Sequence, residues 1–207
     1  MSPQTLAEDL AYVRDLAEAG QRAPLLGGRF LAWWGALTTL AYLCHYGIIS
    51  GAIVAPPVSL AILWIGYAVL GVGGSHFLKA TISKDKPGAS STGNQVTTLV
   101  WKSAGLLLGA YFMGAIFDVM VNNGNYIAFV RSLPLVIGIY GLALYVSGKM
   151  AGNRVLTLAG QVALLATVPA VVLATRPEAW LLGAGVAAFC VLLPGILLMR
   201  NEPSATV

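Results

Sequence analysis

Ionisable and amide side chains that lie in or beside apolar segments are the residues of this chain best suited to chemistry. His45, Asp118 and Arg131 each lie near one end of such a segment, and Asn122 and Asn125 lie in the short turn that separates Asp118 from Arg131. A charged group inside a bilayer is costly unless it is paired or hydrated, so these residues are the first candidates for a site. We group the five as a candidate outer-layer site.

Two roles remain open for this outer-layer site. Antiparallel neighbouring segments would bring Asp118 and Arg131 to similar depth, which predicts a hydrogen-bonded ion pair between them. His45 would reach the same layer from the first segment. The cluster is then either a structural clamp between helices or a site for a ligand, an ion or a proton.

A candidate inner-layer site comprises His76 and Lys102, near the opposite ends of the second and third segments. The long stem of Lys102 favours the simpler interpretation, in which its ammonium group extends to the lipid headgroups. His45 and His76 are expected near opposite membrane faces, so they cannot ligate one haem. No cysteine or histidine spacing typical of zinc occurs either. The sequence predicts no metal and no cofactor.

The elements that must position these residues are membrane helices. Of the 207 residues, 57% are hydrophobic and 10% are charged, against about 25% charged residues in soluble proteins. A helix needs about 20 apolar residues to cross a bilayer. Six apolar segments satisfy this requirement, at residues 29–49, 57–79, 97–120, 127–148, 155–175 and 179–199. Short connections predict an all-α integral membrane protein, a six-transmembrane-helix bundle of three antiparallel hairpins, preceded by a short amphipathic N-terminal helix.

The polar ends complete the predicted organisation. Residues 1–27 would form a cytoplasmic amphipathic helix, over 2–19, and an apolar elbow. Residues 28–200 would form the transmembrane domain, and 201–207 a short cytoplasmic tail. The apolar stripe of 2–19 needs a cover, which the bundle, a second copy or a membrane or cytoplasmic protein partner would supply.

Basic residues predict the orientation. Of the 12 lysines and arginines, only Arg131 and Arg176 fall on the side opposite the N-terminus in the six-span arrangement. Basic residues accumulate on the cytoplasmic side of membrane proteins. We therefore expect a multi-pass protein of the cell inner (plasma) membrane, in contact with the lipid bilayer, with both termini cytoplasmic. The same placement explains the formal net charge of +4 without nucleic-acid binding.

Small residues and prolines indicate how the helices pack. Lipid is as apolar as leucine, so close backbone approach at small residues holds membrane helices together. Stripes of this kind occur at Ser59, Gly66 and Gly73, at Gly105 and Gly109, and at Gly138, Gly141 and Gly148. Pro169 and Pro194 lie inside the last two segments, where each should kink its helix.

Two classes of function are compatible with these features. Glycine stripes, prolines and intramembrane charges favour a small-solute channel or transporter, or a membrane sensor. The alternative is a non-catalytic scaffold, regulatory or assembly subunit that binds a protein partner. The sequence contains no GxSxG, Walker or HExxH motif, so no enzymatic activity is expected. The two classes differ in the centre of the bundle, which a transporter should line with polar groups and a scaffold should fill with apolar side chains.

Overall fold

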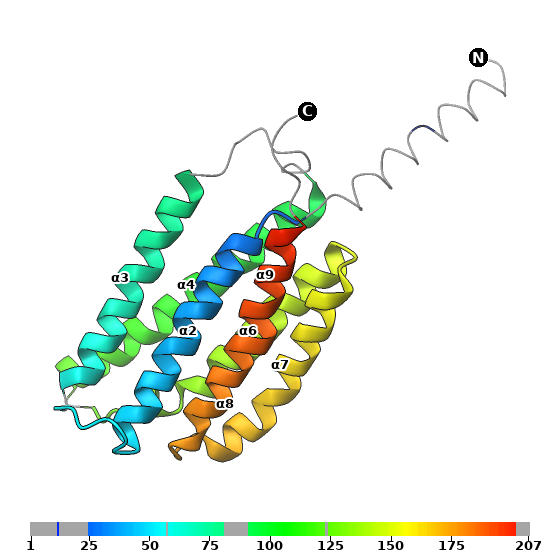
Figure 1. Cartoon of the computed structure of the whole chain (residues 1–207). Helices are drawn as coiled ribbons and strands as arrows, with labels where there is room; N and C mark the ends of the chain where they lie inside the picture. The colour runs from blue at the N-terminus through cyan, green and yellow to red at the C-terminus, as the bar shows by residue number, and fades with distance from the viewer. Residues whose placement is uncertain (1–11, 13–24, 57, 81–90, 123, 202–207) are drawn as a thin grey trace, which may run out of the picture.

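The computed structural model describes residue 12 and residues 25–56, 58–80, 91–122 and 124–201 (Figure 1). The regular elements of this part of the chain are all helical. They are α2 (Gly28–Ile49), α3 (Val58–Ala80), α4 (Thr92–Val121), α5 (Ile127–Val130), α6 (Ser132–Met150), α7 (Arg154–Leu173), α8 (Glu178–Val186), the π-helical η1 (Ala187–Leu192) and α9 (Leu193–Arg200).

The helices fit a membrane-embedded protein. Among the described residues, 5 helices are long and apolar enough to cross a bilayer, with α8, η1 and α9 forming one rod of 23 residues. The expected first span is α2, whose 22 residues include Thr38, His45 and several aromatic rings. It is not one of the 5, because these side chains reduce its hydropathy. The expected count of six spans is therefore not confirmed.

The pair α6 and α7 forms the first half of the core. The two helices lie side by side and are joined by a short turn at Gly152, whose φ of +62° suits glycine. A Cβ atom added to Gly148 would meet the backbone of Thr157, and one added to Gly160 would meet the backbone of Tyr145. These glycines permit close approach of the two backbones, as predicted for the stripe that includes Gly148.

The second half of the core joins the two ends of the described chain. α2 packs along α8, η1 and α9, so the first and last long helices lie side by side (Figure 1). Gly28 and Gly35 face the backbone of α9 and η1 at Leu198 and Leu192, and Gly195 faces the backbone of α2. Between the two halves, the most deeply buried side chains include Leu133, Ile137, Leu144, Leu156 and Val191.

The two prolines behave differently. Pro194 is the second residue of α9, just beyond η1, where the helix widens to π geometry. Proline lacks an amide hydrogen and its ring clashes with the carbonyl four residues earlier, here that of Cys190, so a wider turn before Pro194 relieves the clash. Pro169, by contrast, lies inside an uninterrupted α7.

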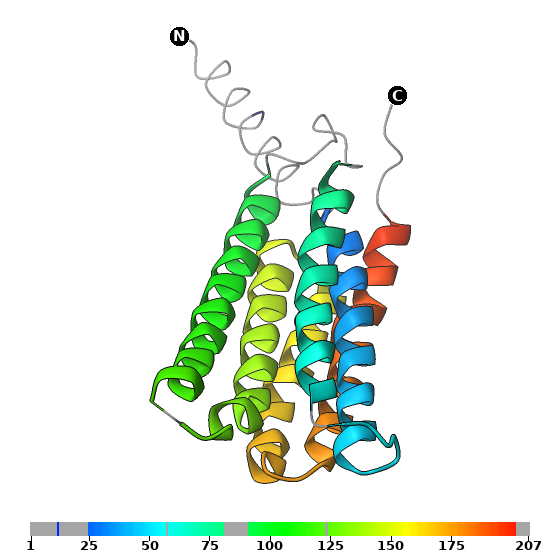
Figure 2. The ribbon, with the colours of Figure 1, turned by 90° about the vertical axis from the view of Figure 1, so that its left-hand side faces the viewer.

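The helices α3 and α4 lie at the periphery of the bundle. α3 packs along α2, and α4 packs along α6 (Figure 2). Gly71 is the one buried residue of α3. Gly66 and Gly73 of α3, and Gly105 and Gly109 of α4, face no described atom within 4 Å. The glycines of those two predicted stripes therefore contact no other described helix.

The arrangement as three hairpins is not confirmed. α2 with α3 and α4 with α6 are neighbours, as expected. The rod formed by α8, η1 and α9 packs more extensively against α2 than against α7. α7 instead makes its main contact with α6, which is why two closely packed pairs, rather than three equivalent hairpins, form the core.

The apolar elbow before α2 is anchored to the start of α4. The Ser91 hydroxyl accepts a hydrogen bond from the Asn94 amide and caps α4. The Asn94 side chain in turn accepts a hydrogen bond from the backbone N–H of Leu26, at 3.0 Å. The predicted helix 2–19 lies outside the described residues except for Tyr12, which is helical and exposed. Of the predicted tail, only Asn201 is described.

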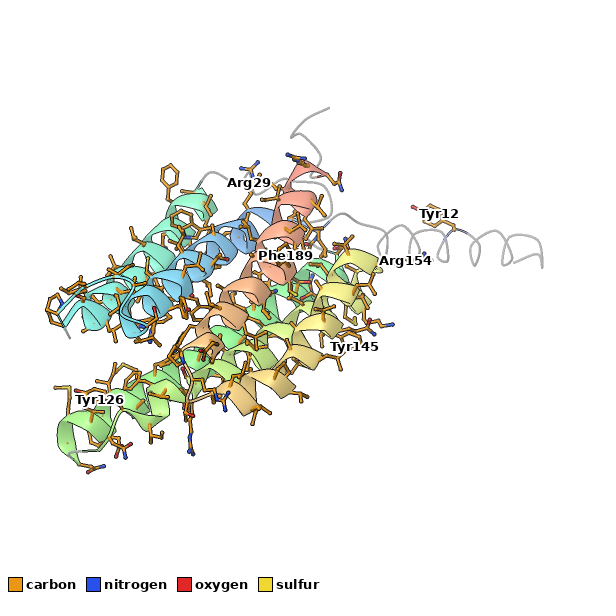
Figure 3. The ribbon with its side chains drawn as sticks, turned by 60° about the horizontal axis from the view of Figure 1, so that its bottom comes forward. Tyr12, Arg29, Tyr126, Tyr145, Arg154 and Phe189 are labelled. Carbon is orange, nitrogen blue, oxygen red and sulfur yellow. The ribbon has the colours of Figure 1, made fainter. Side chains whose placement is uncertain are left out.

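The two ends of the bundle differ in charge. Figure 3 shows Arg29 and Arg154 at one end and Tyr126 at the other. The first end holds the starts of α2, α4 and α7, where the sequence predicts the cytoplasmic face.

Candidate functional site

The structure separates His45 from the other residues of the candidate outer-layer site. His45 lies on α2, whereas Asp118 and Asn122 lie at the C-terminal end of α4, which packs against α6. The Asn122 side-chain amide donates a hydrogen bond to the Asp118 carboxylate, at 3.3 Å. The Asn125 side chain accepts from the backbone N–H of Ile127 and so starts α5. These are local contacts at chain ends.

The expected ion pair between Asp118 and Arg131 does not form a direct contact. Within the described ranges, the side-chain bond of Asp118 is the one with Asn122, and no ion pair within 4.0 Å joins it to Arg131. Arg131 is exposed at the junction of α5 and α6. The short helix α5, which lies between the two residues, was not predicted.

The inner-layer residues also lie apart. His76 is exposed on α3 and Lys102 is exposed on α4. Both side chains project from the two peripheral helices, so neither contributes to the interior of the bundle.

His45 belongs to an aromatic cluster that links three helices. The indole Nε1–H of Trp64 on α3 donates to Nδ1 of His45, at 3.0 Å. The imidazole also stacks on the ring of Trp180 from α8, with a centroid distance of 3.7 Å and an interplanar angle of 17°. Because Nδ1 accepts a hydrogen bond, the imidazole in this arrangement is neutral and carries its proton on Nε2.

Further ring contacts, edge-to-face or tilted, extend the cluster along α2 and α3. Tyr42 contacts both Trp64 and Trp180, at 5.8 Å and 5.4 Å between centroids. Tyr67 contacts Trp64 at 5.4 Å and Trp34 at 5.6 Å. Aromatic pairs in these geometries each contribute about 0.5–1.5 kcal/mol beyond burial of their area. We call the set His45, Tyr42, Trp64, Tyr67, Trp34 and Trp180 the aromatic cluster.

Three hydroxyl groups meet beside this cluster at the middle of the bundle. The hydroxyls of Thr38 on α2 and Tyr67 on α3 are hydrogen-bonded at 2.9 Å. The Tyr140 hydroxyl, from α6, interacts with both. Thr38 is 2% exposed, so the contact is shielded from the surroundings. We call these three hydroxyl groups the hydroxyl triad.

A second set of contacts holds the other half of α3 against α2. The Trp34 indole donates to the Ser75 hydroxyl at 2.9 Å, and the Trp33 indole donates to the Gly71 carbonyl at 3.4 Å. A Cβ atom at Gly71 or Gly74 would overlap these indole rings. The glycines of α3 that contact α2 are therefore Gly71 and Gly74, which lie two residues before and one residue after Gly73 of the predicted stripe.

The helical spacing of residues in the sequence indicates part of these contacts. Trp34, Thr38 and His45 recur at helical spacing on one face of α2. Trp64, Tyr67 and Gly71 do the same on α3. Two such complementary stripes indicate paired helices, but neither the pairing nor the contribution of Tyr140 from a distant segment can be deduced from spacing.

The arrangement is held by ring contacts and by hydrogen bonds between side chains. These bonds form two pairs, Trp64 with His45 and Thr38 with Tyr67. Within the described chain, the buried side-chain atoms that lack a hydrogen-bond partner are the hydroxyl oxygens of Thr97 and Ser147, which lie outside both groups. No set of three or more His, Cys, Asp or Glu side chains that could hold a metal ion occurs among the described residues.

Comparison with protein-family models, with curated proteins and with solved structures gives no match for this chain. The structure by itself must therefore support any functional conclusion.

Proposed function

We propose that this protein is a non-catalytic membrane subunit that binds another membrane protein through the side of the bundle formed by α3 and α4. The observation that carries the proposal is where the bundle places its charges. His76, Lys102 and Arg131 are exposed on the outer surface, whereas the buried core consists mainly of leucine, alanine and other apolar side chains, beside the aromatic cluster and the hydroxyl triad.

This placement is the reverse of what transport requires. In transporters and pumps, ionisable residues of membrane helices face the interior of the bundle or a water-filled cavity, where they line the path of the solute. His76, Lys102 and Arg131 are exposed, and His45 is held by Trp64 and Trp180 in the aromatic cluster. The expectation of a channel or transporter receives no support from these features.

The peripheral helices supply the surface for a partner. α3 and α4 each pack along one neighbouring long helix, and each leaves glycines uncovered by other described residues. Membrane helices associate through such small residues. We include α2 as a sixth span, since its 22 residues run alongside α3 and α9. We also retain the cytoplasmic placement of both termini in the inner membrane.

Photo-crosslinking in native membranes tests the proposal. A photoreactive residue at Leu106 on α4 or Leu70 on α3 should capture a protein in defined stoichiometry at endogenous expression level. The same residue at Leu165, on the exposed side of α7, is the matched control and should capture far less. Equal capture at all three positions would contradict the proposal. Solute flux across the membrane of vesicles that contain only the purified protein would also contradict it.

A further inference from the structure

The position of Lys102 on α4 specifies the chemistry of the partner. Gly93, near the start of α4, packs against Ala151 at the end of α6. Lys102 is nine residues further along, or about 14 Å at 1.5 Å per residue. The 19 residues of α6 span about 28 Å by the same rise. The backbone of Lys102 is therefore level with the middle of α6.

A ring contact confirms this depth independently. Trp101, the neighbour of Lys102, contacts Tyr140 of α6 at 5.6 Å between centroids. Tyr140 is also the α6 member of the hydroxyl triad at mid-bundle. Lys102 is thus deeper than the position near the cytoplasmic face that the sequence predicts.

Lys102 points away from the bundle. At 100° per residue, Lys102, Gly105 and Gly109 share one face of α4, and the buried Ala104 and Ala115 occupy the opposite face. The exposed Leu106 and Met113 flank the glycines on the outer face. No carboxylate of the described residues forms an ion pair with Lys102. A cation at this depth on an apolar surface is costly, and intramembrane charges are normally paired.

We infer that this face of α4 docks a transmembrane helix of a different protein that carries a carboxylate at the level of Lys102. The inference rests on the proposed function and names the partner's chemistry. Gly105 and Gly109 let the partner's backbone approach α4 closely, and the carboxylate accepts hydrogen bonds from the Lys102 ammonium group.

A second copy of this chain does not fit the same face. Copies inserted with one orientation would pair their α4 helices in parallel and bring two Lys102 side chains together, which is repulsive. An antiparallel pair would bring position 118 level with Lys102, but the helical rotation between the two residues, about 160°, turns Asp118 to the opposite face of α4. That pairing needs opposite orientations, which the asymmetric distribution of basic residues disfavours.

Association with a designed probe tests the inference. The full-length protein is reconstituted in phosphatidylcholine vesicles with a single-span leucine/alanine peptide that contains Gly-x-x-x-Gly and one mid-depth Asp. The matched peptide has Leu in place of Asp. By energy transfer, the Asp peptide should associate about tenfold more tightly than the Leu peptide. K102M should abolish this preference, K102R should preserve it, and K149M, at the end of α6, should leave it unchanged.

The outcomes separate the two proposals. Equal association of both peptides with the unaltered protein, or a preference for Asp that survives in K102M, would overturn the carboxylate partner. The crosslink from Leu106 in native membranes is also measured with K102M. If a protein is captured and K102M leaves the crosslinking yield unchanged, this inference is overturned and the proposed function stands. Absence of any protein crosslink from α3 or α4 would overturn the proposed function itself.

Discussion

The bond between Trp64 and His45 should measurably stabilise the docking of α3 on α2. We expect W64F to remove the indole N–H while keeping an aromatic ring, and H45F to remove the acceptor while keeping a ring that stacks on Trp180. Each single variant loses the 3.0 Å hydrogen bond. W64F leaves Nδ1 of His45 without its donor, and H45F leaves the indole N–H of Trp64 without its acceptor. The double variant H45F/W64F isolates the energy of the pair.

The magnitude follows from two terms. Hydrogen bonds between membrane helices contribute about 0.6 kcal/mol on average and about 1.7 kcal/mol at most. The edge-to-face contact of the two rings, at 5.8 Å, adds about 0.5–1.5 kcal/mol, part of which two phenylalanines would retain. Since His45 is half-buried, we expect the lower part of both ranges and a coupling energy of about 1 kcal/mol.

Reversible unfolding in mixed detergent micelles, followed by far-ultraviolet circular dichroism, gives the free energies of unfolding for the four proteins of the cycle. W101F is the matched control, because Trp101 contacts Tyr140 rather than His45. It should show additive effects with H45F. A coupling within about 0.3 kcal/mol of zero for His45 and Trp64, or a coupling as large for the control pair, would refute the reasoning.

Three further predictions concern packing, orientation and the N-terminus. G148L should destabilise the protein by about 1–3 kcal/mol in the same unfolding assay, because the added side chain overlaps Thr157. G66A, at an open position, should leave the free energy of unfolding unchanged. Equal losses of stability in the two variants would contradict the close approach of α6 and α7. In a chain without Cys44 and Cys190, a cysteine at Arg176 should react with an impermeant reagent from outside the cell and one at Ser91 should not; labelling of position 91 would reverse the orientation. Deletion of residues 2–19 should leave membrane insertion intact but change the proteins that co-purify, and unchanged partners and oligomeric state would contradict a docking role for this segment.

The helical fold could be predicted because each long apolar segment must satisfy its own backbone hydrogen bonds in lipid. The boundaries of α2, α3 and α7 agree with the predicted segments to within a few residues. The fourth predicted segment corresponds to α6 together with the short helix α5 that precedes it. The closely packed stripe at Gly141 and Gly148 could be predicted for the same kind of reason, since glycine permits close approach wherever a neighbouring helix is present.

The candidate site could not be predicted in the same way. Charge drew attention to Asp118 and Arg131, but α5 turns the chain between them, and a four-residue helix leaves little trace in an apolar sequence. The residues that do meet at mid-bundle, Thr38, Tyr67 and Tyr140, are neutral and come from three separate segments. Their hydroxyls act as polar groups only because the packing of α2, α3 and α6 brings them together.

The sequence by itself predicted a membrane environment, the helical segments and the direction of insertion, because these predictions depend on local hydropathy and on the counts of basic residues. Only the tertiary structure decided which face of each helix is covered. Lys102 illustrates the difference. Its position in the third apolar segment is evident from the sequence, but its depth depends on the register of α4 against α6. The outward direction of its side chain depends on which face of α4 packs against α6 through its alanines, and that packing is a property of the two helices together.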